Sequence, residues 1–147
     1  RNRPFSKNPR REIGKNYKIY FVDLGVRNAL IGDFNPLNLR SDLGAIWENF
    51  LFTERRKMYA NSGSHLKTYF WRSYSGAEVD YIEKVIKKEL EAFEFKYHGI
   101  SLSRGAASFE SAYGVPVRLI NTENYLPFIT YRTYADRHSG ERSDSRI

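Results

Sequence analysis

The sequence contains no cysteine. The chain can therefore form neither a disulfide framework nor a metal site built on thiolates, and a reducing compartment suits it best. No run approaches the roughly 18 to 20 consecutive apolar residues that cross a bilayer, and the first residues lack the apolar centre of a signal peptide. From these absences we expect a cytoplasmic protein with no membrane partner.

The chain does have an excess of positive charge. Its 147 residues include 24 Lys and Arg against 17 Asp and Glu, which gives a formal net charge of +7. A chain of this length buries one core, so we expect one domain with irregular ends. The basic segment 1–18 favours a polyanionic partner such as nucleic acid, although such arms are often only solvated. The first residue is Arg rather than Met, which suggests a piece of a longer protein.

Local residue patterns predict alternating strands and helices. Aromatic and β-branched runs indicate strands, and apolar residues spaced three and four apart indicate helices. In chain order we expect a strand over 17–24, helices over 26–31 and 42–59, strands over 66–72, 77–83 and 90–97, a helix over 103–113 and a strand over 115–121. The last strand, helix and strand would form a βαβ crossover. Ser41 or Asp42 can cap the second helix.

Strand alternation predicts which side chains share a face of the sheet. In the segment 77–83, one face would carry Val79, Tyr81 and Glu83, and the other Glu78, Asp80 and Ile82. In the segment 90–97, Glu94 and Lys96 would point together, away from the aromatic residues of the same strand. The alternation thus directs an acid and a lysine to one place.

Four charged residues lie in elements whose other residues are predicted to belong to the core. Glu48 is near the middle of a helix, Asp80 is in a strand, and Glu94 and Lys96 are in the next strand. Carboxylates from separate elements offer hard oxygen ligands for Mg²⁺ or Mn²⁺, and such a cation binds phosphate oxygens and acidifies a water. A lysine two residues after a ligand acid can orient that water or stabilise charge on phosphate.

Each of these residues also has a structural interpretation. Glu94 and Lys96 can form an ion pair that only satisfies the strand, and Glu48 can pair with Arg55 or Arg72. Other polar and aromatic residues are expected to be structural. Asp23 would shape a turn, since Asp readily bonds local backbone. The three histidines share no zinc-ligand spacing, and the large aromatics Trp47, Phe50, Phe70 and Trp71 are expected in the core rather than as base-stacking platforms.

Two patterns resemble known families. Asp80, followed by Glu94-Phe95-Lys96, resembles the D...(D/E)xK motif of the PD-(D/E)xK nuclease superfamily, with Glu48 where its helix-borne acid is usual. A longer match covers about residues 4–130 and looks like the C-terminal domain of unknown function carried by a family of prokaryotic AAA-type ATPases. The segments that carry this match are 18–25, 40–44, 47–50, 69–72 and 78–83.

The resemblance implies an α/β fold of restriction-endonuclease-like type, a mixed central sheet flanked by helices. The nuclease-like domain would cover 19–130, preceded by a basic arm (1–18) left from a winged-helix wing and followed by a polar tail (131–147) that is disordered or not native to the protein. Asp80, Glu94 and Lys96 would be catalytic. Asp80, Glu94 and Glu48 would hold Mg²⁺ or Mn²⁺, and Arg72 and Tyr97 would contact nucleic acid.

The function that the resemblance implies is that of a magnesium-dependent phosphodiesterase acting on DNA, as the C-terminal domain of an ATPase. The alternative is a non-catalytic module of the same fold that docks the ATPase module to DNA or to a protein. A third interpretation is an accessory domain that only oligomerises. The chain has no Walker-type phosphate loop, so we expect no ATPase activity in it.

Overall fold

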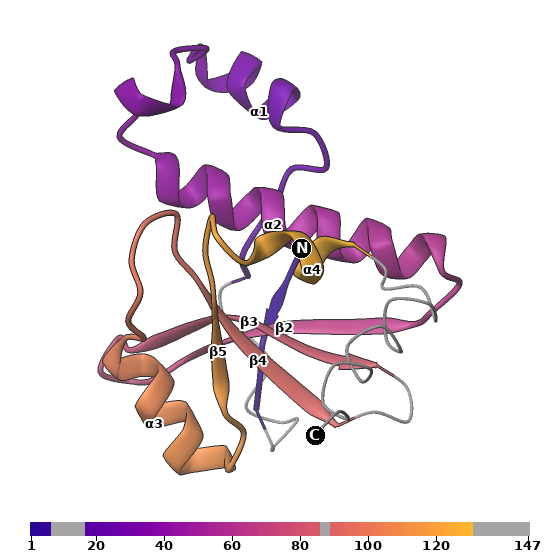
Figure 1. Cartoon of the computed structure of the whole chain (residues 1–147), viewed down its shortest axis with the longest axis vertical. Coiled ribbons are helices and arrows are strands. Elements are labelled where there is room, and N and C mark those ends of the chain that lie inside the picture. The colour runs from indigo at the N-terminus through magenta and orange to yellow at the C-terminus, as the bar shows by residue number, and fades with distance from the viewer. Residues whose placement is uncertain (7–16, 86–88, 131–147) are drawn as a thin grey trace, which may run out of the picture.

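The computed structural model describes residues 1–6, 17–85 and 89–130. The predicted tail at 131–147 and most of the predicted basic arm lie outside these residues. The elements, in chain order, are β1 (Arg3–Pro4), α1 (Leu24–Ile31), the short 3-10 helix η2 (Leu37–Leu39), α2 (Leu43–Asn61), β2 (Leu66–Arg72), β3 (Glu78–Val85), β4 (Leu90–Phe95), α3 (Arg104–Tyr113), β5 (Val117–Ile120) and α4 (Tyr125–Ile129). They form the mixed α/β arrangement that Figure 1 shows.

Within the described residues, the strands make one five-stranded sheet in the order β1-β2-β3-β4-β5. The pairs β2–β3 and β3–β4 are antiparallel, whereas β1–β2 and β4–β5 are parallel. The parallel pair β4–β5 is joined through α3, which confirms the predicted βαβ crossover. The mixed central sheet with flanking helices is therefore as expected.

The strand predicted over 17–24 is wrong. Lys18 makes only an isolated antiparallel bridge to Asn2, and the following backbone pairs with a side chain instead of a strand. The amide of Asn49 on α2 accepts from the Phe21 backbone N–H at 2.8 Å and donates to the Phe21 carbonyl at 2.7 Å. This amide satisfies the backbone groups that a neighbouring strand would have bonded.

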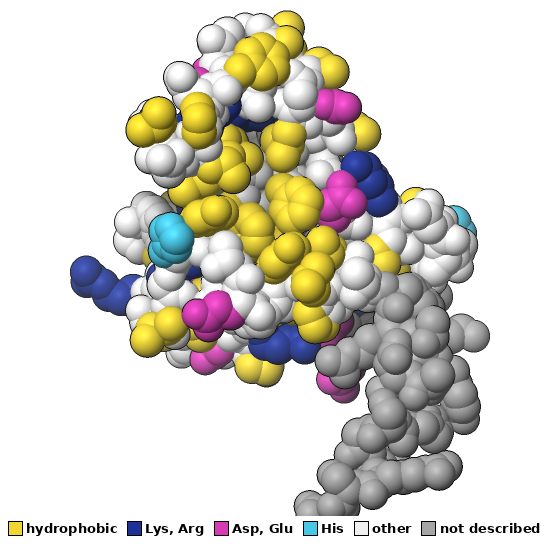
Figure 2. Space-filling view, turned by 45° about the horizontal axis from the view of Figure 1, so that its top comes forward, with side chains coloured by type: hydrophobic (Ala, Val, Ile, Leu, Met, Phe, Trp, Pro, Cys, Tyr) yellow, Lys and Arg dark blue, Asp and Glu magenta, His cyan; other side chains and the backbone are white. Residues whose placement is uncertain are grey.

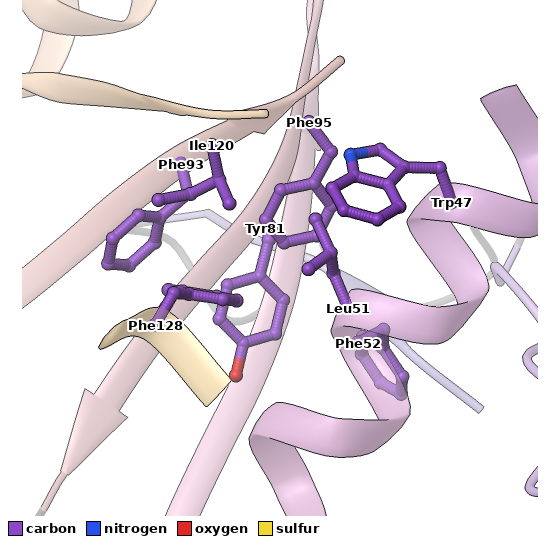
Figure 3. Close-up of a cluster of buried hydrophobic side chains, with 8 residues drawn as sticks. All are labelled: Trp47, Leu51, Phe52, Tyr81, Phe93, Phe95, Ile120 and Phe128. Carbon is purple, nitrogen blue, oxygen red and sulfur yellow. The ribbon is translucent and has the colours of Figure 1, made fainter. Parts of the chain in front are cut away.

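Helices cover both faces of the sheet (Figure 1). On one face α2 and α4 bury a largely aromatic cluster, which Figure 3 shows in close-up. Its members are Trp47, Leu51, Phe52, Tyr81, Phe93, Phe95, Ile120 and Phe128. On the opposite face α3 packs against a second cluster of Val79, Ile82, Ala92, Ala106, Phe109 and Val117. Trp47 and Phe70 are buried, as expected for core aromatics.

A β-bulge interrupts β3. Tyr69 of β2 faces Ile82, but Trp71, two residues further, faces Val79, three residues back. Two residues of β3, Asp80 and Tyr81, therefore stand opposite one residue of β2. Such a bulge bends a strand and redirects its side chains.

The predicted alternation along β3 is consequently wrong at its N-terminal end. Val79 packs beside Ile82 in the α3-side cluster, whereas Tyr81 belongs to the cluster under α2. Because of the bulge, Val79 and Tyr81 point to opposite faces of the sheet although they are two residues apart. Asp80, between them, belongs to neither hydrophobic cluster.

The α1 segment stands apart from the core and contributes no buried side chain to it. Asp23 caps α1 by accepting from the Val26 N–H at 3.1 Å, which confirms its predicted turn role. Asp42 stands at the start of α2 but makes no capping bond, because its carboxylate binds Arg40 and Arg27. In the described part of the chain, none of the helices combines the length and apolarity needed to cross a membrane.

Candidate metal centre

Lys18 lies at the centre of an acidic cluster. Its Nζ is 2.8 Å from Oε1 of Glu48 and 3.7 Å from Oδ1 of Asp80, and it also contacts Oε1 of Glu78. Glu48 comes from α2, and Glu78 and Asp80 come from the start of β3. The lysine comes from the segment before α1. All four side chains are largely buried, with 18 to 23% of each exposed.

Tyr20 holds one acid of the cluster, Glu48, in place. The Tyr20 hydroxyl donates to Oε1 of Glu48 at 2.5 Å, and its ring stacks on Phe52 with the centroids 3.8 Å apart. Burial and the neighbouring Glu48 carboxylate raise the pKa of Tyr20 far above its usual range, so the hydroxyl keeps its proton and remains a donor. Glu48 is therefore held by an ammonium and a hydroxyl at the same oxygen.

The cluster carries more negative than positive charge. Burial, followed by the Glu48 carboxylate, raises the pKa of Asp80 to about 6. For Lys18, burial lowers the pKa, but the charges and hydrogen bonds of Glu48 and Glu78 outweigh burial and the net shift is upward. The amine of Lys18 therefore stays protonated. A single ammonium does not neutralise all the carboxylates that surround it.

Glu94 and Lys96 form a second group at the end of β4, where they point together as predicted. Lys96 Nζ lies 3.3 Å from Oε1 of Glu94 and donates to the Ser101 carbonyl at 2.6 Å. Glu94 is buried, at 5% exposure. Its Oε2 accepts from the Ser103 backbone N–H at 2.9 Å, at the N-terminus of α3, where backbone donors and the helix dipole favour an anion.

The start of α3 is pressed against the strand that carries the acids. An added Cβ at Gly105 would lie 2.2 Å from the carbonyl oxygen of Glu78. Only a residue without a side chain allows this approach. Ser103 caps the helix by accepting from the Gly105 N–H at 3.1 Å.

Asp80 connects the two groups. Its Oδ2 accepts from the Phe95 backbone N–H at 2.9 Å, directly after Glu94. The structure thus brings Glu48 and Asp80 together around Lys18, and ties Asp80 to the strand end that presents Glu94 and Lys96.

The donor chemistry fits Mg²⁺ or Mn²⁺, because the cluster offers carboxylate oxygens and an ammonium already stands among them as a cation. The arrangement is nevertheless closed. Within residues 1–6, 17–85 and 89–130, no three acid or histidine side chains are placed to hold a metal ion as they stand. Lys18 lies where their oxygens converge.

The two residues expected to contact nucleic acid lie in different surroundings. Arg72 is half exposed, and its Nε donates to Oε2 of Glu78 at 2.7 Å, so it borders the acidic cluster. Tyr97 packs edge-on against Trp47 with the centroids 5.4 Å apart. It lines an apolar pocket of about 520 Å³ between α1 and α2, and none of the acids of the cluster borders this pocket.

The alternative partners expected for Glu48 are occupied elsewhere. Arg55 binds Glu83 through two hydrogen bonds of 3.0 and 2.6 Å beneath α4, and Arg72 binds Glu78. Glu48 does form an ion pair, as its structural interpretation expected, but the partner is Lys18 and neither of these arginines.

Sequence reasoning missed Lys18, Tyr20 and Glu78. The available signal was the alternation of Lys18 and Tyr20 around an apolar residue, which places a cation and a donor on one side of an extended segment. The predicted boundary between arm and domain at 18/19 divides this pair.

These features define a mixed α/β domain with a largely buried cluster of acids and lysines at one end of the sheet. Residues 43–136, more than half of the chain, match the family described as "Domain of unknown function (DUF4143)". The chain belongs to this family. No curated protein and no solved structure matches the chain significantly.

Proposed function

We propose that this domain binds Mg²⁺ or Mn²⁺ through Asp80, Glu94 and Glu48 and acts on phosphodiesters of DNA, as a nuclease-like domain of restriction-endonuclease type attached to an ATPase module. The observation that carries the proposal is the convergence of Glu48 and Asp80 on one cation position, beside the strand end with Glu94 and Lys96. This arrangement combines hard oxygen donors with a cationic side chain, as metal-assisted phosphodiester cleavage requires.

Each residue has a defined task in this proposal. Asp80, Glu94 and Glu48 would hold the cation, which when bound supplies Lewis acidity toward phosphate and a more acidic water. Lys96 would orient the attacking water or stabilise the charge that develops on phosphate. Its carbonyl contact to Ser101 and its ion pair with Glu94 hold the ammonium at the strand end. Arg72 is exposed enough to contact a phosphate backbone.

The test is calorimetric titration of Mn²⁺ into the wild-type chain and into the Asp80→Ala, Glu94→Ala double variant. A Glu54→Ala, Glu91→Ala double variant is the matched control, because it removes the same charge from two exposed ion pairs outside the cluster. We expect binding in the wild type and the control, and none in the first variant. If Mn²⁺ binds neither to the wild type nor to a variant that lacks Lys18, the metal site is rejected.

A DNA-cleavage assay with Mg²⁺ on the same proteins, and on Lys96→Met, decides whether the metal serves catalysis. Loss of cleavage in Lys96→Met with retained Mn²⁺ binding is the result expected of a nuclease. Metal binding without any cleavage in the wild type would leave a metal-binding module that does not cut.

A second function is a docking module, and the apolar surface favours it. Apolar side chains gather over the end of the molecule where α1 lies (Figure 2). Val26, Leu30 and Phe34 are 55, 71 and 70% exposed. Exposed apolar area of this kind commonly marks a protein interface. Loss of binding to the parent ATPase module in Leu30→Ser, with metal binding unchanged, would assign this surface to docking.

A further inference from the structure

We propose that Lys18 controls whether a divalent cation can occupy the acidic cluster: its ammonium holds the acids in the absence of metal and must leave when metal binds. This inference rests on the proposed metal site. Lys18 Nζ contacts one oxygen each of Glu48 and Glu78 and lies 3.7 Å from Oδ1 of Asp80. A divalent cation bound to both Glu48 and Asp80 would take the space between the two carboxylates, which the ammonium now fills.

An ammonium and a divalent cation cannot share this position. Two like charges held a few ångströms apart in a largely buried site repel strongly, because little water screens them. A bound metal therefore excludes Lys18, and Lys18 excludes the metal. The closed arrangement of acids around Lys18 is one of these two states.

Each acid has a second partner that would keep it in place after Lys18 leaves. Glu48 accepts from the Tyr20 hydroxyl, Asp80 from the Phe95 N–H, and Glu78 from Arg72. The carboxylates would not collapse or turn outward once the ammonium is gone. A site whose donors are fixed independently of its occupant is preorganised for another cation.

The lysine can leave without a change of fold. Its charge lies at the end of a flexible four-carbon stem, on a segment that forms no regular strand in the described structure. The backbone of this segment is anchored on both sides, by the bridge to Asn2 and by the Phe21–Asn49 bonds. A change of side-chain rotamer would therefore move the ammonium away from the acids while the backbone stays in place.

The experiment is Mn²⁺ titration calorimetry on wild type, Lys18→Gln and Lys57→Gln. Lys57 is the matched control, because it is an exposed lysine paired with Glu54 on α2. If Lys18 occupies the cluster in nine molecules of ten, its removal tightens Mn²⁺ binding roughly tenfold. Lys57→Gln should bind as the wild type does. Equal or weaker binding by Lys18→Gln would overturn the inference.

A second variant guards against loss of folding. Lys18→Gln leaves the acids with excess charge, whereas Lys18→Gln combined with Glu78→Gln removes one charge of each sign and keeps all three proposed ligands. Thermal unfolding in EDTA and in Mn²⁺ gives a readout independent of activity. The melting temperature of the double variant should rise more with Mn²⁺ than that of the wild type.

The outcomes separate the two proposals. If no protein binds Mn²⁺, including both Lys18 variants, the metal site and the role of Lys18 fail together. If the wild type binds Mn²⁺ and neither Lys18 variant binds more tightly, only the role of Lys18 fails. Binding by the variants alone would support both, with Lys18 as the group that closes the site.

Discussion

Asp80 Oδ2 accepts the backbone N–H of Phe95 at 2.9 Å, in the place of a strand-to-strand hydrogen bond. The paired register of β3 and β4 ends at Tyr81 and Phe93, and beyond it a carboxylate satisfies the backbone of β4. The sheet is thus opened at the end where the acids gather. An acid fixed in this way cannot turn to solvent without leaving a buried N–H unpaired.

Asp80 should make folding stability depend on pH. Its pKa is raised from 3.8 to about 6 in the folded chain, so the folded state binds its proton more tightly than the unfolded state does. Ionisation therefore costs stability as pH rises through this window. Relative to wild type, Asp80→Asn should gain on the order of 2 kcal/mol between pH 4 and pH 7.

Urea denaturation in EDTA at several pH values measures this gain. Asp23→Asn, at an exposed capping residue, is the control and should follow the wild type more closely. A constant difference between Asp80→Asn and wild type from pH 4 to 7 would contradict the expected shift.

Tyr20→Phe should destabilise the chain by removing one hydrogen bond and little else. The stacked ring on Phe52 is retained, but the 2.5 Å bond to Glu48 is lost. A hydrogen bond to a charged group is worth about 1.5–3 kcal/mol. Chemical denaturation measures the loss, and Tyr74→Phe, at a residue that is 99% exposed, should show almost none. If both substitutions change the stability equally, the hydrogen bond from Tyr20 to Glu48 does not stabilise the fold.

Arg55→Met should be severely destabilising. Glu83 is 1% exposed and bound to Arg55 on both of its oxygens, so the substitution leaves a buried charge without its main partner. Breaking such a pair costs about 3–5 kcal/mol. Combining it with Glu83→Gln should recover part of the loss, because the unpaired charge is gone. If the double variant is less stable than Arg55→Met, the pair is not the cause.

Gly105→Ala and Gly44→Ala should have opposite effects. The new methyl group at Gly105 would meet the Glu78 carbonyl at 2.2 Å, whereas that at Gly44 meets nothing within 4 Å. Overpacking costs about 1–3 kcal/mol, while alanine in place of a helical glycine gains about 0.5–1 kcal/mol. Thermal unfolding of the two variants compares them directly. Similar changes at both positions would refute the close contact of α3 with β3.

The regular elements could be predicted because their signals are local. The apolar spacing of α2 and α3, and the aromatic runs of β2 and β4, are set within each segment and agree with the packing around them. The bulge in β3 left no such signal. Polar and apolar residues alternate through Asp80, so the residues alone favour an uninterrupted strand.

The site was predicted in part for the same reason. Glu94 and Lys96 are two apart on one strand, and strand periodicity alone brings them together. Lys18 reaches Glu48 and Glu78 from thirty and sixty positions away in the chain, so only the assembled fold places them in contact. The segment that carries Lys18 also has the residue pattern of a strand. That pattern gave no indication that its side chains contact the acids.

The bridge between Asn2 and Lys18 has a structural consequence. Two backbone hydrogen bonds, of 2.7 and 3.0 Å, join these residues, and the next residues of the same end pair with β2. The first residues also reach the core, because Phe5 packs against the α3-side cluster. One short N-terminal segment therefore links the backbone of Lys18 to the edge of the sheet and to the core beneath α3.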